Sequence, residues 1–144
     1  MNSIEQKQHD IVREFEDFAD WQEKYEYLIE MGFDLPPLDA QYKVEEKRIL
    51  GCQSNVWLHS EYLSDQGLMH YAADSDSMIV KGLISMLIQV LSEQRPEDIV
   101  TTRLDFLNQI GLDRHLSSTR SNGLASMVKE MKQQAALHLG AVEA

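Results

Sequence analysis

The sequence is short of cysteine and of long apolar runs, and both shortages exclude whole classes of protein. The single cysteine among 144 residues, Cys52, cannot close an internal disulfide. The longest uncharged apolar run, from Gly82 to Val90, is far shorter than the roughly 20 apolar residues that span a bilayer. The chain also lacks the basic and then apolar start of a secretory signal. Together these absences predict a cytoplasmic protein with no membrane partner.

Basic side chains are also scarce. Lysine and arginine number 13 against 24 aspartate and glutamate residues, so the net charge is −11. A chain this acidic is repelled by phosphate backbones and anionic lipid headgroups, which argues against a nucleic-acid partner. Two interpretations of the charge remain open: a surface that only keeps the protein soluble, and an acidic face for a basic protein partner.

Paired metal ligands are missing as well. The one cysteine and five histidines do not recur at the spacings of zinc sites. The sequence therefore predicts no bound metal.

Helical periodicity dominates both ends of the chain. Apolar residues recur every three to four positions over residues 4–18 and again over 21–29, where Asp20 supplies an N-cap and Gly32 ends the helix. A broad apolar stripe over residues 79–91 predicts a central helix. Shorter patterns predict a helix that begins near Pro96, another over residues 106–110, and a last helix that starts within residues 117–122.

Between these helices the hydrophobic period changes to two. Residues 48–50, 56–63 and 68–73 are predicted to form a three-stranded antiparallel meander. The order of helices, meander and helices predicts an α+β fold, and the length predicts a single domain over residues 1–144.

A four-residue turn at 64–67 fixes the register of the predicted hairpin. Leu63 then faces Leu68, and Trp57 faces Asp74. One face suits burial and the other suits water. The buried face is predicted to hold Val56, Leu58, Tyr62, Met69, Tyr71 and Ala73, and the wet face His59, Glu61 and His70.

The only cysteine occupies a polar turn, residues 51–55, in which Gly51 permits tight backbone geometry. The hairpin brings this turn to the same end of the sheet as Asp74 and Asp76, where the central helix also begins. A helix N-terminus and nearby cations favour the thiolate, which is the nucleophilic form of Cys52, whereas carboxylates oppose it. An inert thiol that packs as a small hydrophobic group is the alternative interpretation.

Two other residues are candidates to assist the thiol. A cysteine hydrolase needs a histidine within hydrogen-bond reach of the sulfur, and His115 is the candidate because His59 and His70 lie along the hairpin. Arg120 is the only cation in the polar run 117–123. Its alternative role is that of a solvated residue at the start of a helix.

Four motifs in this order resemble the SufE family, the sulfur-acceptor partners of cysteine desulfurases. The resemblance covers residues 11–136 and departs from the family pattern at Ser77, where alanine is expected. The motifs are Gly51-Cys52-Gln53-Ser54 with Val56-Trp57-Leu58, Trp21 to Ile29 followed by Leu35-Pro36, Ser75-Asp76-Ser77 with Ile79 to Leu83, and His115 to Arg120 with Asn122-Gly123-Leu124.

The resemblance implies a mechanism and a fold like that of the iron–sulfur scaffold proteins. A pyridoxal-phosphate desulfurase would pass persulfide sulfur to Cys52, and the sulfur would then move to a cluster scaffold. The protein would stimulate the desulfurase and hold no cofactor of its own. Asp74 and Arg120 would lie near the thiol. The residues expected to bind the partner are Gly51, Gln53, Ser54, Asp76, Lys81, His115, Asn122 and Gly123.

Three alternatives stay open beside this one. The protein regulates a desulfurase without carrying sulfur, it serves a related desulfurase system, or it is an independent thiol enzyme that uses Cys52 with His115. The resemblance favours a sulfur-transfer partner over a stand-alone enzyme.

Overall fold

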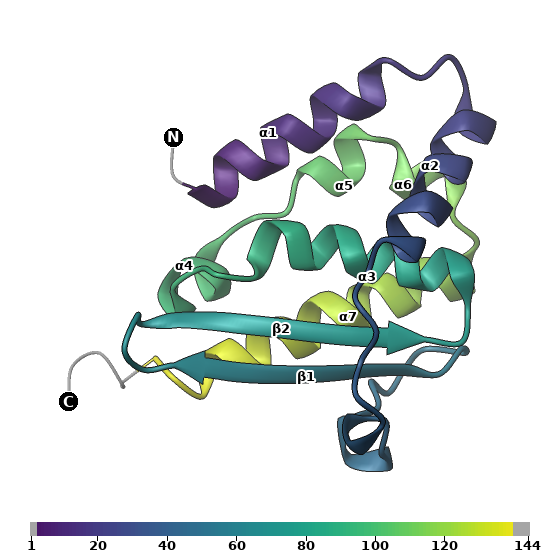
Figure 1. Cartoon of the computed structure of the whole chain (residues 1–144). Helices are drawn as coiled ribbons and strands as arrows, with labels where there is room; N and C mark the ends of the chain where they lie inside the picture. The colour runs from purple at the N-terminus through teal and green to yellow at the C-terminus, as the bar shows by residue number, and fades with distance from the viewer. Residues whose placement is uncertain (1–2, 140–144) are drawn as a thin grey trace.

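The computed structural model describes residues 3–139, and both ends of the predicted 1–144 domain lie outside these residues. Figure 1 shows a hairpin with helices stacked against one of its faces. The elements in chain order are α1 (Ser3–Glu16), α2 (Trp21–Phe33), the 3-10 turns η1 (Ala40–Tyr42) and η2 (Glu45–Lys47), β1 (Val56–Leu63), β2 (Leu68–Ser75), α3 (Met78–Leu91), α4 (Pro96–Thr101), α5 (Phe106–Gln109), α6 (Leu112–His115) and α7 (Ser118–Ala136).

The hairpin forms in the predicted register. Leu63 pairs with Leu68 and Trp57 with Asp74, so the alternation of apolar and polar residues places one complete face against the core. Gly67, in the turn, has a φ of 70°, which glycine adopts without strain. The predicted buried face is confirmed for Val56, Leu58, Met69, Tyr71 and Ala73, while Tyr62 is half-buried.

The predicted third strand is wrong, because the described sheet has two strands. Residues 48–50 make only an isolated bridge, Arg48 to Trp57, with the Ile49 amide donating to the Val56 carbonyl at 2.8 Å. The 3-10 turn η2 ends immediately before this bridge, and Gly51, with a φ of 91°, bends the chain immediately after it. The extended segment between these two bends is too short to form a β-ladder with β1.

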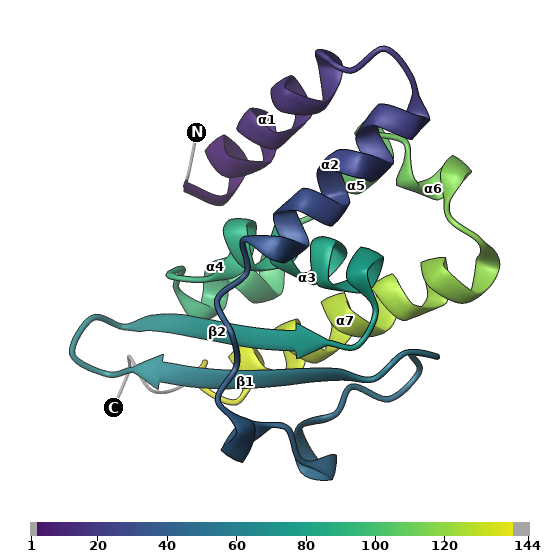
Figure 2. The same ribbon diagram turned by 45° about the vertical axis from the view of Figure 1, so that its right-hand side comes forward.

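The prediction that His59 lies in water is also wrong. Its side chain is only 14% exposed, because residues 38–47 cross the outer face of the hairpin and the Tyr42 ring stacks on the imidazole at 3.7 Å. Figure 2 shows this segment running from α2 across both strands. Glu61 and His70, further along the hairpin, are exposed as predicted.

The central helix is α3, as the apolar stripe predicted. Ten of its 14 residues are buried between the sheet and α2. Helices α2 and α3 touch closely at Gly82, where a Cβ would lie 2.0 Å from the Leu28 carbonyl oxygen, so glycine is required there. Helix α7 completes the layer on the buried face of the sheet, and the Tyr71 hydroxyl donates to the Met131 carbonyl at 2.6 Å. Both helices start at the end of the sheet that carries residues 51–55 (Figure 1).

Candidate functional site

The turn that carries Cys52 is pinned against α7. Gly51 has a φ of 91°, in the left-handed region that other residues enter at a cost of about 1–2 kcal/mol. A Cβ at this position would also lie 2.4 Å from the Ser126 Oγ on α7. Glycine therefore permits both the bend of the chain and its close approach to the helix.

The thiol of Cys52 is half-buried and faces a small cavity between its own turn and the helices. Its Sγ donates a hydrogen bond to the Gly123 carbonyl oxygen at 3.4 Å. The cavity holds about 70 Å³, more than the share of liquid volume that one water takes, which is about 30 Å³. It is lined by Cys52, Gln53, Ser54, Val80, Ser117, Thr119, Arg120, Gly123 and Met127.

The protonation state of Cys52 follows from this placement. Burial raises the pKa of the Cys52 thiol above its ordinary value, because desolvation penalises the thiolate. Helix α7 begins beside the cavity, with Ser117 as its N-cap accepting the Arg120 amide. Burial therefore favours the protonated thiol, the less nucleophilic form, in the free protein.

The raised pKa predicts the pH dependence of alkylation. Because only the thiolate reacts, we expect the rate for native protein to keep rising at pH values where an ordinary cysteine is already fully ionised. The measurement is the iodoacetamide rate against pH, with urea-unfolded protein as the control for the ordinary pKa. Coincident midpoints for native and unfolded protein would contradict the burial that the structure gives to the thiol.

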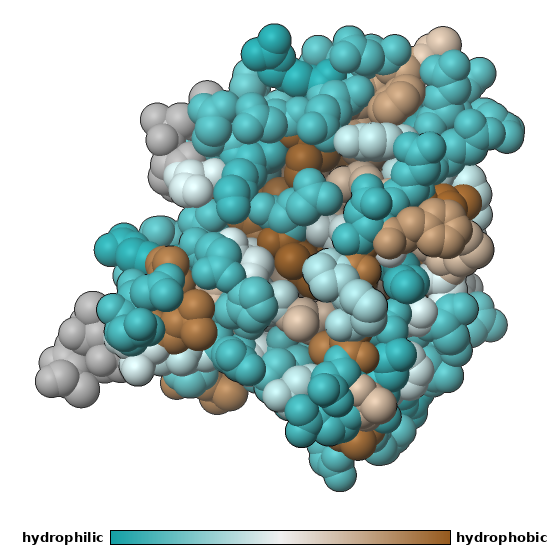
Figure 3. Space-filling view, in the orientation of Figure 1, coloured by the Kyte–Doolittle hydropathy of each residue, from teal (hydrophilic) through white to brown (hydrophobic). Residues whose placement is uncertain are grey.

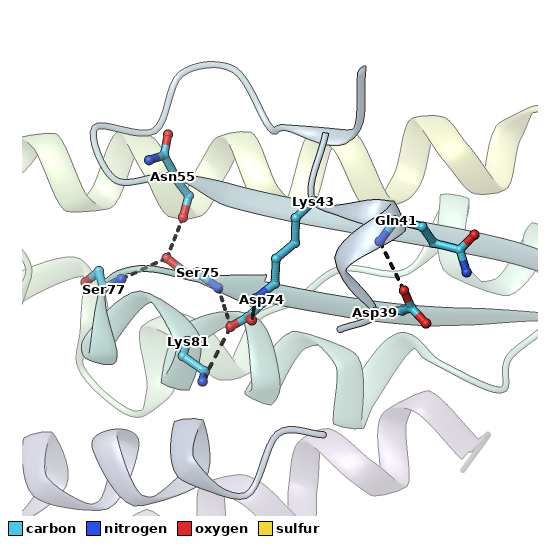
Figure 4. A network of polar contacts seen from close by, with 8 residues as sticks. All are labelled: Asp39, Gln41, Lys43, Asn55, Asp74, Ser75, Ser77 and Lys81. Carbon is cyan, nitrogen blue, oxygen red and sulfur yellow. Dashed lines mark hydrogen bonds and ion pairs between the residues drawn. The ribbon is translucent and has the colours of Figure 1, made fainter. Parts of the chain in front are cut away.

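Ser75 and Asp76, which precede α3, clamp the base of the Cys52 turn, and Figure 4 shows the contacts of Ser75 with Asn55 and Ser77. The Asp76 carboxylate accepts both the Asn55 amide N–H, at 3.1 Å, and the Asn55 Nδ2, at 2.9 Å. The Ser75 hydroxyl donates to the Asn55 carbonyl at 2.7 Å, and its Oγ accepts the Ser77 amide at 3.2 Å. Asp76 thus holds the turn in place three residues from the thiol without lining the cavity itself.

Breaking this clamp should expose the thiol. In Asp76→Asn the new amide Nδ2 faces the Asn55 Nδ2, donor against donor, so we expect alkylation of Cys52 in the free protein to accelerate several-fold. Asp65→Asn is the matched control, because Asp65 lies in the exposed turn at the other end of the hairpin. If both variants are alkylated at the wild-type rate, the clamp does not control access to the sulfur.

Asp74 lies at the predicted end of the sheet, but its carboxylate points to the outer face. It pairs with Lys43 at 2.7 Å and with Lys81 at 3.4 Å, and it does not line the cavity (Figure 4). Burial alone would raise the pKa of Asp74, yet the hydrogen bonds from Lys43 and the Ser75 amide and the two lysine charges hold it below its usual value. Asp74 thus lies in an ion cluster with Lys43 and Lys81 rather than among the residues that line the cavity, and the partner-binding role expected of Lys81 stays a prediction.

His115 does not join the cavity either. Its ring stacks on Trp21 at 4.5 Å, since α6 packs near the start of α2, and no histidine is among the residues that line the cavity. Asn122 is exposed and also lies outside the lining. Of the predicted site residues, the structure brings together Cys52, Gln53, Ser54, Arg120 and Gly123.

Sequence reasoning missed four lining residues: Val80, Ser117, Thr119 and Met127. Val80 and Met127 fit the helical apolar pattern, which marks them as core, although Val80 also lies in the motif from Ile79 to Leu83. Ser117 had a local signal that could have been used, since a serine three residues before Arg120 at a helix start is a typical N-cap.

The described part of the chain shows neither a metal site nor a membrane span. Within residues 3–139 no group of three or more histidine, cysteine, aspartate or glutamate side chains is arranged to hold a metal ion. In the same residues, none of the helices has both the length and the apolarity to cross a membrane.

Comparison with known proteins identifies the family. Residues 9–135 match the SufE family, described as an Fe-S metabolism associated domain. The chain is 35% identical over 138 residues to an uncharacterized SufE-like protein of Rhizobium meliloti (strain 1021), with 94% of this chain and 96% of that protein covered. It is 39% identical over 133 residues to SufE-like protein 1, chloroplastic/mitochondrial, of Arabidopsis thaliana, covering 92% of this chain and 35% of that protein.

A solved structure supports the fold independently of sequence. The solution structure of a hypothetical protein from Thermus thermophilus superposes with a TM-score of 0.75 at 19% identity, covering 92% of this chain and 96% of that one. At this identity the likeness shows the fold alone, and it agrees with the α+β architecture described above. The resemblance of the four sequence motifs is confirmed by the family match over most of the chain, and this protein belongs to the SufE family.

Proposed function

We propose that the protein accepts sulfur on Cys52 from the persulfide of a cysteine desulfurase and delivers it toward iron–sulfur cluster assembly in the cytoplasm. The observation that carries the proposal is the position of the only cysteine. It lies at a cavity lined by residues of three of the motifs, those of the Cys52 turn, the start of α3 and the start of α7, together with Met127. A structural cysteine would more often be packed into the apolar core.

The transfer is a thiol–disulfide type of exchange that balances without an oxidant. The Cys52 thiolate attacks the outer sulfur of the donor persulfide, a new Sγ–S bond forms, and the S–S bond of the donor breaks. The donor cysteine leaves as a thiolate and takes up the proton that Cys52 lost. The product is a persulfide on Cys52 and a desulfurase ready for another turnover.

The cavity suits the storage of that sulfur. A persulfide in open water is lost to any passing thiol, so a carrier benefits from a surface that shields it. The apolar side chains of Val80 and Met127 line part of the cavity that the Sγ faces. Arg120 adds the one cation among the lining residues, and its guanidinium would stabilise the negative charge of a persulfide or thiolate.

The alternative of a stand-alone thiol enzyme with Cys52 and His115 loses its support, since His115 packs on Trp21 outside the cavity. A regulator that carries no sulfur would never form a persulfide on Cys52, and this product distinguishes the two hypotheses. We would incubate the protein with a cysteine desulfurase and free cysteine, and then map modifications by mass spectrometry. One added sulfur on the peptide that contains Cys52 supports the carrier; a stimulated desulfurase with unmodified Cys52 supports the regulator.

A further inference from the structure

Two large apolar side chains are exposed where the end of α2 meets the start of the central helix. Phe33, the last residue of α2, is 68% exposed, and Met78, the first residue of α3, is 49% exposed. The backbone next to Phe33 approaches that of Met78, because Gly32 packs on the first turn of α3, where a Cβ at Gly32 would lie 3.0 Å from the Met78 carbonyl oxygen. We name them the Phe33–Met78 patch. Figure 3 shows brown and tan surface gathered on the right of the molecule, over the end of α2.

The patch lies at the same end of the molecule as the thiol. Met78 follows the clamp by two residues, and Asp76 in that clamp is bonded to Asn55, three residues from Cys52. In Figures 1 and 2 the start of α3 and the turn before β1 meet at the right-hand side of the view. Any protein that brings a persulfide to Cys52 must therefore cover surface close to the patch.

The charges around the patch are mainly acidic. Glu30 and Asp34, the C-cap of α2, flank Phe33 in the sequence. Burial is the main cause of the raised pKa of Tyr27, and the charges of both carboxylates add to it. Asp76 is exposed beside Met78. Lys81, in the first turn of α3, is paired with Asp74. An apolar centre with an acidic rim fits a partner whose apolar pocket is bordered by lysine or arginine.

We propose that the Phe33–Met78 patch is a docking contact for the cysteine desulfurase, which presents an apolar pocket with a basic rim to it. This inference rests on the proposed function for the identity of the partner. Aromatic and methionine side chains at the centre of an interface carry much of its binding energy, whereas a charged rim sets the association rate and the salt dependence. The patch therefore contributes affinity, and Cys52 contributes the chemistry.

The test is direct binding, measured by calorimetry with the cysteine desulfurase of the same organism whose nucleophilic cysteine is replaced by alanine. Phe33→Ser and Met78→Gln should each weaken the affinity at least about tenfold, and raising the salt concentration should weaken binding of the wild type further. Leu137→Ser is the matched control, because Leu137 is 75% exposed at the distant end of α7 and should leave the affinity unchanged.

Three results would overturn the inference. The first is wild-type affinity in both patch variants. The second is an equal loss in Leu137→Ser. The third is a wild-type dimer that becomes monomeric in Phe33→Ser without a loss of desulfurase affinity, because the patch would then join two copies of this chain. If the patch variants weaken binding as expected but Cys52 accepts no sulfur, the proposed function is wrong and the docking inference still holds. The two outcomes are separable because binding of the inactive desulfurase is measured without any transfer.

Discussion

Cys52→Ser is expected to lose all sulfur acceptance while its thermal midpoint stays within about 4 °C of the wild-type value. Serine keeps the size of the side chain and can still donate to the Gly123 carbonyl oxygen, 3.4 Å from the sulfur in the wild type. The side chain is half-buried at a cavity, so little packing is lost. A hydroxyl forms no persulfide, and the chain has no second cysteine to replace it.

The measurement pairs intact-mass spectrometry after incubation with a desulfurase and cysteine with a thermal melt of the same sample. Ser64→Ala is the control variant, because Ser64 lies in the exposed turn at the other end of the hairpin and should leave the number of sulfur atoms accepted unchanged. Sulfur still gained by Cys52→Ser would refute the assignment of the nucleophile. A large fall in the thermal midpoint would instead show that the thiol is structural.

Local sequence patterns were enough to predict the elements around this site. The hairpin register follows from a four-residue turn between Leu63 and Leu68, since one slipped residue would turn every apolar side chain of the strands to the wrong face. The N-cap at Asp20 and the central helix carry equally local signals, and both are found as predicted. These features depend on residues a few positions apart.

The errors come from contacts between distant segments. The expected third strand fails because η2 and Gly51 bend the chain on both sides of Arg48, which no alternation pattern reports. His59 is covered by Tyr42, 17 positions earlier, and its period-two pattern is the same whether or not that face is covered. Asp74 lies at the predicted end of the sheet, and its pairing with Trp57 in the predicted register already places it on the outer face, where it binds Lys43.

The cavity itself could not be predicted from the residues near Cys52. Its far wall comes from the first turns of α7, where Gly123 lies 71 positions after the cysteine. The motifs that identified the family contained Gly123 and Arg120 but said nothing of their distance from the sulfur. Only the close packing of α7 against the turn, which Gly51 permits beside Ser126, brings these residues together.

Docking of a desulfurase is expected to increase the alkylation rate of Cys52 by about ten- to a thousandfold. In the free protein the thiol is half-buried and bonded to Gly123, and burial raises its pKa, so a reactive outward state is a minor one. If the outward state is populated at roughly 0.1–10%, a partner that makes it fully populated raises the alkylation rate by about ten- to a thousandfold. The partner must bind the outward state better than the inward one, because equal binding shifts nothing.

The experiment uses a desulfurase that lacks its own nucleophilic cysteine, so that the probe can label only Cys52. Asp76→Asn provides the internal comparison, because a turn already released from Asn55 should react faster alone and gain less from the partner. At saturating desulfurase we therefore expect the alkylation rates of the wild type and of Asp76→Asn to become equal. Equal rates under these conditions would show that the clamp opens on docking. Equal rates with and without the partner, or rapid labelling of the free wild type, would mean that the thiol is open to solvent and that the cavity does not guard it.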